Sequence, residues 1–337
     1  MPERGTLLEA TGLAKSFTVR RTVRGGTRLR ALDGVDLTLG RGETLGLVGE
    51  SGCGKSTLAR VLLRLERPDA GTVRYEGVDP FALSGAELLA WRRKVQMVFQ
   101  DPFGSLNPRL SAADLIGEPW LAHRGLVPPS RRAARVAELL EMVGLRASDA
   151  ARHPHEFSGG QRQRIGIARA LALEPEVIVC DEPVSALDLS VQAQVLNLLC
   201  DLRDELGLSY VFISHDLSVV RHLADRVAVM YLGRIAETGP TEEVYERPRH
   251  PYTEALLSAA PSPVAGGGRR RQRIVLTGEI PSPADPPSGC RFRTRCPRAR
   301  DLCAEAVPEP PPGAPLHGAA CHFPLEETPE GTSAVTA

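Results

Sequence analysis

GESGCGKST, from Gly49 to Thr57, is the most informative motif of this chain. It fits the pattern G-x-x-x-x-G-K-[ST], follows the apolar run LGLV (45–48) and opens a segment of helical periodicity from about Lys55 to Leu65. In such a loop, glycines allow backbone N–H groups to converge on phosphate oxygens, and the start of the following helix supplies further donors. The sequence therefore predicts a phosphate-binding loop between a strand and a helix.

The residues of this loop have expected parts in binding ATP and Mg²⁺. The Lys55 ammonium suits a bridge between the β- and γ-phosphates, and the Ser56 hydroxyl suits Mg²⁺. The other expected nucleotide contacts come from the loop and the helix start: Gly49, Glu50, Ser51, Gly52, Cys53, Gly54 and Thr57. We therefore expect ATP and Mg²⁺ as cofactors.

A second acidic centre lies in VIVCDEP (177–183), where an apolar run ends in two carboxylates. Asp181 suits Mg²⁺ binding through water, and Glu182 suits a general base that polarises the attacking water. A strand that ends in Asp-Glu is, in isolation, more often a solvated edge. In a chain that also has a phosphate loop, it predicts a catalytic centre.

The order of apolar and helical segments indicates the fold class. From Leu7 to about Ala260, short apolar runs alternate with helical stretches, which predicts an α/β fold with a mostly parallel sheet. Besides 45–48, the expected strands are 95–99, 177–180, 210–213 and 226–230. An insertion with helical periodicity predicts a helical subdomain at about 101–157, and the arginine-rich stretch 20–30 predicts a solvated hairpin.

The composition changes at Pro261, and we place a domain boundary there, after an ATPase domain at 1–260. Residues 261–273 are rich in proline, glycine and arginine and are expected to be a linker. Residues 274–324 have many prolines and few apolar residues, so this extension is not expected to form a core of its own. Residues 325–337 are expected to be a disordered tail.

Charge and hydropathy exclude several classes of protein. Lys and Arg total 41, as do Asp and Glu, so no net field draws the chain onto nucleic acid, and we expect no nucleic-acid partner. The first residues lack the apolar core of a secretory signal, and no run of roughly 18 apolar residues occurs. We expect the chain to remain in the cytosol and not to span a membrane.

FSGGQRQRIGIARAL (157–171) resembles the signature of ABC ATPases. The other motifs of that family follow in the expected order: Gln100 resembles the Q-loop glutamine, SALD (185–188) the D-loop, and His215 the H-loop histidine. Phe17 is placed like the aromatic residue that stacks on adenine, although packing under the first strand is the alternative.

This resemblance covers about residues 7–260 and implies a P-loop NTPase (RecA-like) core with a mostly parallel sheet, an antiparallel β subdomain and an inserted helical subdomain. It also implies a sandwich of two subunits with two ATP molecules at the interface. Lys55, Gln100, Glu182 and His215 would then be catalytic, and Ser56, Gln100 and Asp181 would hold Mg²⁺. The contacts to nucleotide expected from the second subunit and the D-loop are Ser158, Gly159, Gly160, Gln161 and Asp188.

Three further segments, at 101–109, 187–199 and 250–261, resemble the ATP-binding subunits of oligopeptide and dipeptide importers, a group that also contains nickel and glutathione systems. The resemblance implies an ATPase on the cytoplasmic face of the bacterial inner membrane that energises solute import as a peripheral subunit. Its expected partners are a second homologous ATPase, two transmembrane permease subunits and, indirectly, an extracytoplasmic solute-binding protein. We expect the two ATPase subunits to be unlike and to form a heterodimer. We expect Phe103, Leu106 and Leu110 to receive a helix of the permease.

Two other functions compete with solute import. ABC-type ATPases of DNA repair carry long coiled-coil insertions or DNA-binding modules, and those of translation carry two ATPase domains in one chain. Neither feature occurs in this sequence. Peptide import is therefore the favoured function, with nickel or glutathione import as the alternative within the same group.

A small extension that contains cysteine closes the chain. Cys290, Cys296, Cys303 and Cys321 are spaced C-x5-C-x6-C-x17-C and lack the C-x2-C pair of a typical zinc site. Four thiolates suit iron–sulfur or Zn²⁺. The resemblance to peptide importers favours a [4Fe–4S] cluster, with Zn²⁺ and unliganded thiols as the alternatives.

Overall fold

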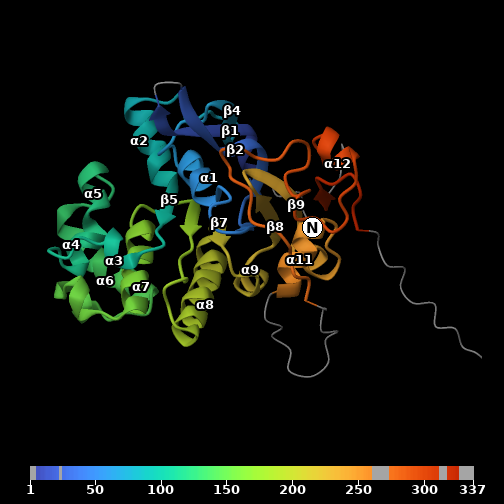
Figure 1. The fold of residues 1–337 in the computed structure, drawn as a ribbon. Coiled ribbons are helices and arrows are strands. Elements are labelled where there is room, and N and C mark those ends of the chain that lie inside the picture. Colours follow the sequence, from blue (N-terminus) through green and yellow to red (C-terminus); the bar gives the residue numbers. More distant parts are fainter. Residues whose placement is uncertain (1–4, 23–24, 260–272, 311–316, 326–337) are drawn as a thin grey trace, which may run out of the picture.

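The computed structural model describes residues 5–22, 25–259, 273–310 and 317–325 (Figure 1). One of its two sheets is antiparallel, with the strand order β2-β1-β4. Its strands are β1 (Thr6–Thr22), β2 (Gly25–Gly40) and β4 (Ala70–Tyr75). Because β1 and β2 pair as far as Thr22 and Gly25, the predicted hairpin is confirmed.

The larger sheet has the strand order β10-β9-β8-β3-β7-β6-β5. The strands are β3 (Thr44–Val48), β5 (Val95–Val98), β6 (Val177–Asp181), β7 (Ser209–Ser214), β8 (Arg226–Tyr231), β9 (Arg234–Pro240) and β10 (Gly318–Ala319). All pairs from β8 to β5 are parallel, whereas β9 and β10 are antiparallel to their neighbours. The predicted α/β fold with a mostly parallel sheet is therefore confirmed.

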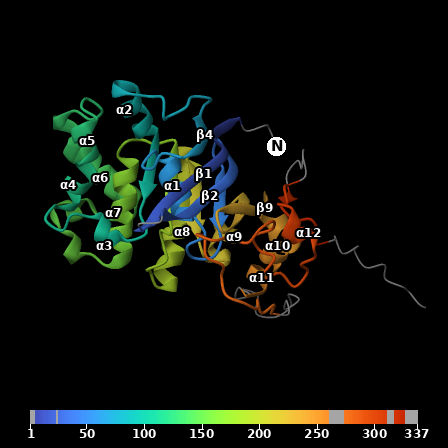
Figure 2. The same cartoon turned by 45° about the horizontal axis from the view of Figure 1, so that its top comes forward.

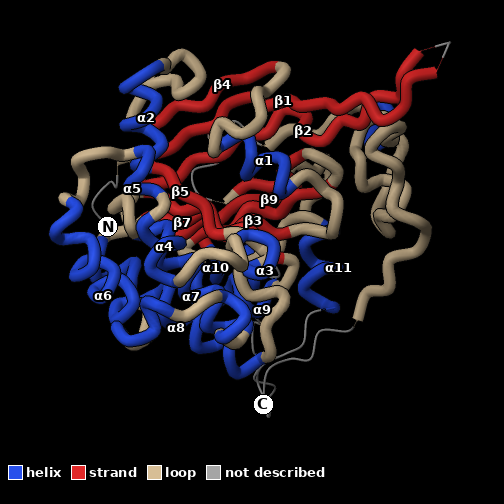
Figure 3. The backbone as a smooth tube through the Cα atoms, turned by 90° about the vertical axis from the view of Figure 1, so that its left-hand side faces the viewer, coloured by secondary structure: helices blue, strands red, loops and turns tan. Residues whose placement is uncertain are grey.

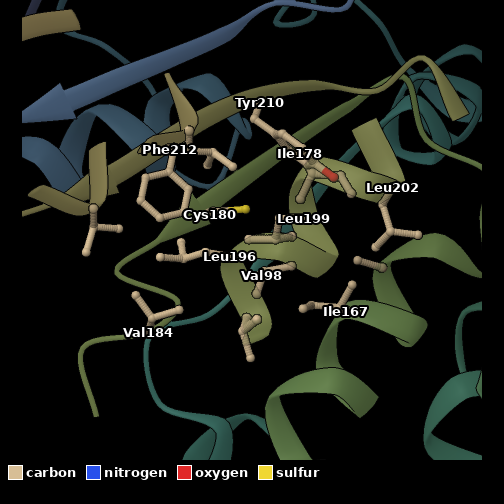
Figure 4. Close-up of a cluster of buried hydrophobic side chains, with 14 of the residues drawn as sticks. Val98, Ile167, Ile178, Cys180, Val184, Leu196, Leu199, Leu202, Tyr210 and Phe212 are labelled. Atoms are coloured by element: carbon tan, nitrogen blue, oxygen red, sulfur yellow. The ribbon is translucent and has the colours of Figure 1, made fainter. Parts of the chain in front are cut away.

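The two faces of the parallel strands pack against different layers. In β7, Tyr210 and Phe212 join one apolar core, while Val211 and Ile213 join the other, as the alternation of side chains along a strand requires. Figure 4 shows the first core, where Ile178, Cys180 and Phe212 point toward leucines of α8 (Leu189–Leu206). The second core holds α1 (Lys55–Leu62) between the two sheets. Figure 3 shows the two sheets as separate layers.

Between β5 and β6, every element of the described chain is helical. These elements are α3 (Pro102–Ser105), α4 (Ala112–Gly117), α5 (Pro119–Ala122), η1 (Pro129–Arg131), α6 (Arg132–Met142), η2 (Ala147–Ala151), η3 (Pro154–Glu156) and α7 (Gly159–Leu171). Figure 2 places them on one side of the sheets and the C-terminal residues on the other. Trp120 is fully buried in this part, and its indole Nε1 donates to the carbonyl of Ala172 at 2.8 Å.

The remaining helices are α2 (Gly85–Lys94), α9 (Leu217–Leu223), α10 (Thr241–Glu246), α11 (Pro251–Ala259) and α12 (Leu302–Glu305). The C-terminal extension shares the core of the larger sheet: Phe292 is 2% exposed and packs against Tyr231 and Tyr252. The extension also adds β10 to the edge of the sheet beside β9. The predicted linker and most of the predicted tail lie outside the described residues. Among the helices of the described chain, none is long and apolar enough to cross a membrane.

Candidate active site

The phosphate loop joins β3 to α1, as the sequence predicts. Gly54 has a φ of 115°, and a Cβ atom there would lie 2.3 Å from the carbonyl oxygen of Ala31. A side chain at this position would therefore meet both backbone strain and a backbone atom that cannot move away. The loop needs glycine at Gly54 because it passes close to the backbone of β2 at Ala31.

Lys55 is buried at the first position of α1. Its Nζ atom donates to the carbonyl oxygens of Gly49 at 2.7 Å and of Glu50 at 3.1 Å. The ammonium group is thus held inside the loop by the loop's own backbone. Phosphate oxygens that enter the loop would meet a cation already aimed at them.

Ser56 and Asp181 lie together although they come from α1 and β6. The Ser56 Oγ donates to Asp181 Oδ1 at 3.3 Å. Burial raises the pKa of Asp181, and the hydrogen bond from Ser56 opposes that shift. A buried carboxylate beside a hydroxyl is a set of hard oxygen ligands that a bound cation would stabilise in its ionised form.

Glu182 is held by side chains from the two strands next to β6. Gln100 follows β5, and its Nε2 donates to Glu182 Oε2 at 3.0 Å; His215 follows β7, and its Nδ1 lies 3.2 Å from the same oxygen. The Glu182 backbone has a φ of 46°, which few non-glycine residues adopt, and its N–H donates to the carbonyl of Ile213 at 3.0 Å. Three predicted catalytic residues therefore meet at the carboxyl edge of the parallel sheet.

The signature residues occupy the start of α7. Ser158 accepts from the N–H of Gln161 at 3.3 Å, and the Gln161 side chain accepts from the N–H of Ser158 at 3.0 Å. This is a capping box that satisfies two donors of the helix terminus. Within the described chain, the hydrogen bonds of these two side chains stay inside this terminus, and none joins them to the phosphate loop. Ser158 itself is exposed.

Two other residues of the signature and D-loop have evident packing roles. Gly160 allows α7 to approach α8, because a Cβ atom there would lie 2.2 Å from Val191. Asp188 caps α8 by accepting from the N–H of Val191 at 3.0 Å and from the Ser190 hydroxyl at 2.7 Å. Gly159 lies between Ser158 and Gly160 at the start of α7. Contact of these residues with a nucleotide stays a prediction.

Phe17 lies on β1 opposite Leu29 of β2. The Lys15 ammonium lies 5.4 Å from the centroid of its ring. The ring is half-buried, so one part of it remains open to solvent. Stacking on adenine stays a prediction for this residue.

The side chains that hold Glu50 were not foreseen. The Glu50 N–H donates to the hydroxyl of Tyr252 at 3.1 Å, and Arg295 pairs with both carboxylate oxygens at 2.7 and 3.0 Å. The sequence predicts Glu50 only as a nucleotide contact. Tyr252 and Arg295 belong to α11 and the C-terminal extension, and neither fits a motif that points to the phosphate loop.

All four cysteines of the extension line one pocket, together with His250, Phe292, His322 and Phe323 among others. Burial raises the pKa of the Cys290 and Cys296 thiols and raises that of Cys321 to about 11. The thiols thus gather as the sequence predicts. Across the described residues, however, no three or more His, Cys, Asp or Glu side chains are arranged so that they could hold a metal ion.

The predicted docking residues for a permease helix are partly wrong. Leu106 is 3% exposed and belongs to the first core, and Leu110 packs against that core. The side chain of Phe103 lies outside what the structure describes. Phe99, which directly precedes Gln100, is 42% exposed, with the Arg169 guanidinium 6.0 Å from its ring centroid. Phe99 is therefore an exposed apolar side chain beside Gln100, whereas Leu106 is buried.

Comparison with known proteins connects this site to a family. A family model described as ABC transporter matches residues 32–185, and one described as oligopeptide/dipeptide transporter, C-terminal region, matches 236–303. The chain is 53% identical to the oligopeptide transport ATP-binding protein AppF of Bacillus subtilis, over 94% of this chain and 97% of the relative. It is 54% identical to the dipeptide transport ATP-binding protein DppF of Haemophilus influenzae, over 91% and 93% of the two chains.

Solved structures agree with these relatives. A dimeric ATP-binding cassette, MJ0796, in a post-hydrolysis state with ADP and Pi, superposes with a TM-score of 0.62 at 31% identity, over 70% of this chain and 99% of that one. A cassette of Clostridium perfringens, cbiO1 of the complex cbiONQ, gives a TM-score of 0.61 at 27% identity, over 72% and 91%. This chain belongs to the ABC transporter ATPases, in the family of oligopeptide and dipeptide transport ATP-binding proteins.

Proposed function

We propose that this chain hydrolyses ATP to energise the import of di- or oligopeptides through an inner membrane. The observation that carries the ATPase is the Glu182 carboxylate, which Gln100 and His215 hold beside the phosphate loop. The names of the relatives support peptides as cargo, since AppF and DppF are oligopeptide and dipeptide transport proteins.

Hydrolysis follows from the residues at the carboxyl edge of the sheet. ATP enters the phosphate loop, and Lys55 exchanges its bonds to the Gly49 and Glu50 carbonyls for bonds to the β- and γ-phosphates. Glu182 accepts a proton from a water molecule, whose oxygen attacks the γ-phosphorus while the bond to the ADP oxygen breaks. Gln100 and His215 keep the Glu182 carboxylate on the side of the attacking water.

Mg²⁺ fits the oxygen ligands that the chain offers. Ser56 and Asp181 would hold the ion, with Gln100 as a third contact. When bound, Mg²⁺ offsets negative charge on the phosphates. The buried Asp181 is suited to this role because burial disfavours its negative charge, which a bound cation would stabilise, and because the Ser56 hydroxyl lies beside it.

The site is completed by a second ATPase subunit. Ser158, Gly159, Gly160 and Gln161 start an α-helix, and the exposed Ser158 leaves this terminus free to face the γ-phosphate on a partner. The partner is a homologous, unlike subunit, and two permease subunits dock near Phe99 on the cytoplasmic face. A solute-binding protein outside the membrane delivers the peptide to the permeases.

For the four thiols of the extension we propose a [4Fe–4S] cluster as the ligand, with Zn²⁺ and unliganded thiols as the alternatives. All four line one pocket, and a cluster of four irons spaces its thiolates farther apart than a single ion does. Anaerobic purification should yield brown protein that absorbs broadly near roughly 400 nm and contains iron and sulfide in equal amounts. Colourless protein with one zinc per chain would instead establish Zn²⁺ as the ligand.

Reconstitution tests the proposed function. The full chain, a companion ATPase and two permeases in lipid discs should hydrolyse ATP faster when the solute-binding protein carries a peptide. A Lys55→Ala chain should remove this activity, and nickel or glutathione should not replace the peptide. Stimulation by nickel alone would overturn peptide import, and absence of ATP hydrolysis in every assembly would overturn the ATPase.

A further inference from the structure

The segment of the extension between Cys290 and Cys296 lies against the phosphate loop. Arg295 is 8% exposed, and its two terminal nitrogens lie 2.7 and 3.0 Å from the two carboxylate oxygens of Glu50. Such a two-bond pair fixes the orientation of both planar groups, which a single contact does not do. The guanidinium therefore sets where the Glu50 side chain lies.

The backbone of Glu50 is held from the same side. Its N–H donates to the hydroxyl of Tyr252 at 3.1 Å, and the Tyr252 ring lies 5.3 Å from that of Phe292. Phe292 is only three residues before Arg295 and lines the cysteine pocket. One short segment of the extension thus supports both the side chain and the backbone of a phosphate-loop residue.

A second arginine anchors this segment to the ATPase part. Arg291 is buried and bonds to the Asp33 carboxylate and to the carbonyl oxygen of Leu232. Gly233, which follows Leu232, donates its N–H to the carbonyl of Cys53 in the phosphate loop at 2.7 Å. Because the segment is anchored at Arg291, Arg295 cannot shift freely away from Glu50.

The charge of Glu50 gives this contact a consequence for ATP. An unpaired carboxylate in the phosphate loop would repel the phosphates of ATP, and a freed loop would lose part of its preformed shape. Arg295 offsets the charge and restrains the loop at the same time. Both effects favour binding of the nucleotide, while neither involves the atoms that react.

We propose that Arg295 is a positioning residue of the ATP site, through which the C-terminal extension sets the affinity for ATP. This inference rests on the ATP site proposed above. It assigns the extension a part in nucleotide binding in addition to any ligand that its thiols hold. Loss of the Arg295 contact weakens ATP binding and leaves the chemical step nearly unchanged, because binding is lost equally in the ground and transition states.

The test compares Arg295→Met with Arg300→Ala in the full chain. Methionine keeps an unbranched side chain but removes the donors, whereas Arg300 is exposed and stacks on Phe323 without contact to the phosphate loop. We expect Arg295→Met to raise KM and the Kd of a fluorescent ATP analogue about tenfold, with kcat within about twofold. Arg300→Ala should match the unaltered chain in all three quantities.

A double substitution separates positioning from a general loss of structure. If Arg295 acts through Glu50, adding Glu50→Gln to Arg295→Met should not weaken binding further and should restore the part of the affinity that the unpaired carboxylate removes. The proposal would be overturned if Glu50→Gln and Arg295→Met raised Kd by independent factors that multiply in the double variant. An Arg295→Met chain with unchanged KM and Kd would also overturn it. A chain that merely folds less well loses active sites but keeps its KM. Failure of the unaltered chain to bind ATP would instead refute the proposed function.

Discussion

Nδ1 of His215 lies 3.2 Å from Oε2 of Glu182, although the two residues follow different strands, β7 and β6. Gln100, after β5, donates to the same oxygen. Because the three strands are parallel neighbours in the order β7-β6-β5, their carboxyl ends bring these side chains to one edge of the sheet. The carboxylate is thereby oriented before any nucleotide enters.

Glu182→Gln should lower the rate of ATP hydrolysis by at least about 100-fold and leave ATP affinity unchanged. The amide keeps the shape of the side chain but does not accept the proton of the attacking water. With its companion subunit, the variant should accumulate as an ATP-bound dimer in size-exclusion chromatography. Turnover close to that of the unaltered chain would remove Glu182 from its assigned role.

His215→Ala should lower kcat by roughly 10- to 100-fold, because the Glu182 carboxylate loses one of its two supports. In a Glu182→Gln chain, the same substitution should have little further effect, since both residues act on one proton transfer. Steady-state kinetics of the two single variants and the double variant measure this. Independent, multiplied losses would show that His215 acts separately from Glu182.

Asp181→Asn should stabilise the nucleotide-free chain against unfolding at neutral pH. The same substitution should lower the rate of Mg²⁺-dependent ATP hydrolysis on the order of 100-fold. Burial raises the pKa of Asp181 in the fold, so protonation favours the folded state. The stability from Asp181 is thus full below about pH 3.9, the pKa of an unfolded aspartate, and is lost as the pH rises through the higher folded pKa. Thermal unfolding in EDTA from pH 4 to 8 should show a gain in Tm that grows with pH; a gain that is constant or reversed would contradict it.

Ser158→Ala and Ser111→Ala should lower the free energy of unfolding by similar amounts, but they should differ in their effect on ATP-dependent dimerisation. Both serines cap helices through a capping box, at α7 and α4, so each substitution should lower the free energy of unfolding by about 1 kcal/mol. Only Ser158→Ala should also abolish ATP-dependent dimerisation, which light scattering measures. Equal dimerisation of the two variants would exclude a role for Ser158 at the partner's nucleotide.

Phe292→Ala should lower the free energy of unfolding by about 3–5 kcal/mol, because it empties a site between Tyr231 and Tyr252. Val275→Ala, in the same extension, should change it by less than about 0.5 kcal/mol, because Val275 is 75% exposed. Urea denaturation measures both. A small effect of Phe292→Ala would mean that the extension contributes little to the shared core.

Much of the fold follows from local sequence. The runs at 45–48 and 177–180 are short and almost wholly apolar, as strands covered on both faces must be, and the structure places both in the larger sheet. The prediction for Leu106 failed because local sequence does not tell an apolar docking residue from a core residue. Leu106 is buried in a core that includes residues of α4, α6 and α7, so its burial depends on segments far apart in the chain.

For the cysteines, too, the sequence predicts one part of the arrangement and the fold decides the other. Their crowding near the C-terminus predicted that they act together, and the structure brings all four to one pocket. Sequence spacing could not predict the distances between the thiols, because these depend on how the extension folds over β9 and α11. That packing also brings Arg295, the direct sequence neighbour of Cys296, to the phosphate loop.

The phosphate loop, the strand before it and the helix after it can be read from the local sequence, because the motif 49–57 and the apolar run 45–48 are contiguous in the chain. The local sequence also determined the two carboxylates at the end of β6. The partners of the acidic side chains depend on the tertiary fold: Gln100 and His215 contact Glu182, while Arg295 pairs with the Glu50 carboxylate and Tyr252 accepts from the Glu50 backbone N–H. These partners meet through the order of strands and the return of the extension onto the sheet, and a pair of charges far apart in a chain leaves no periodic pattern that would reveal it.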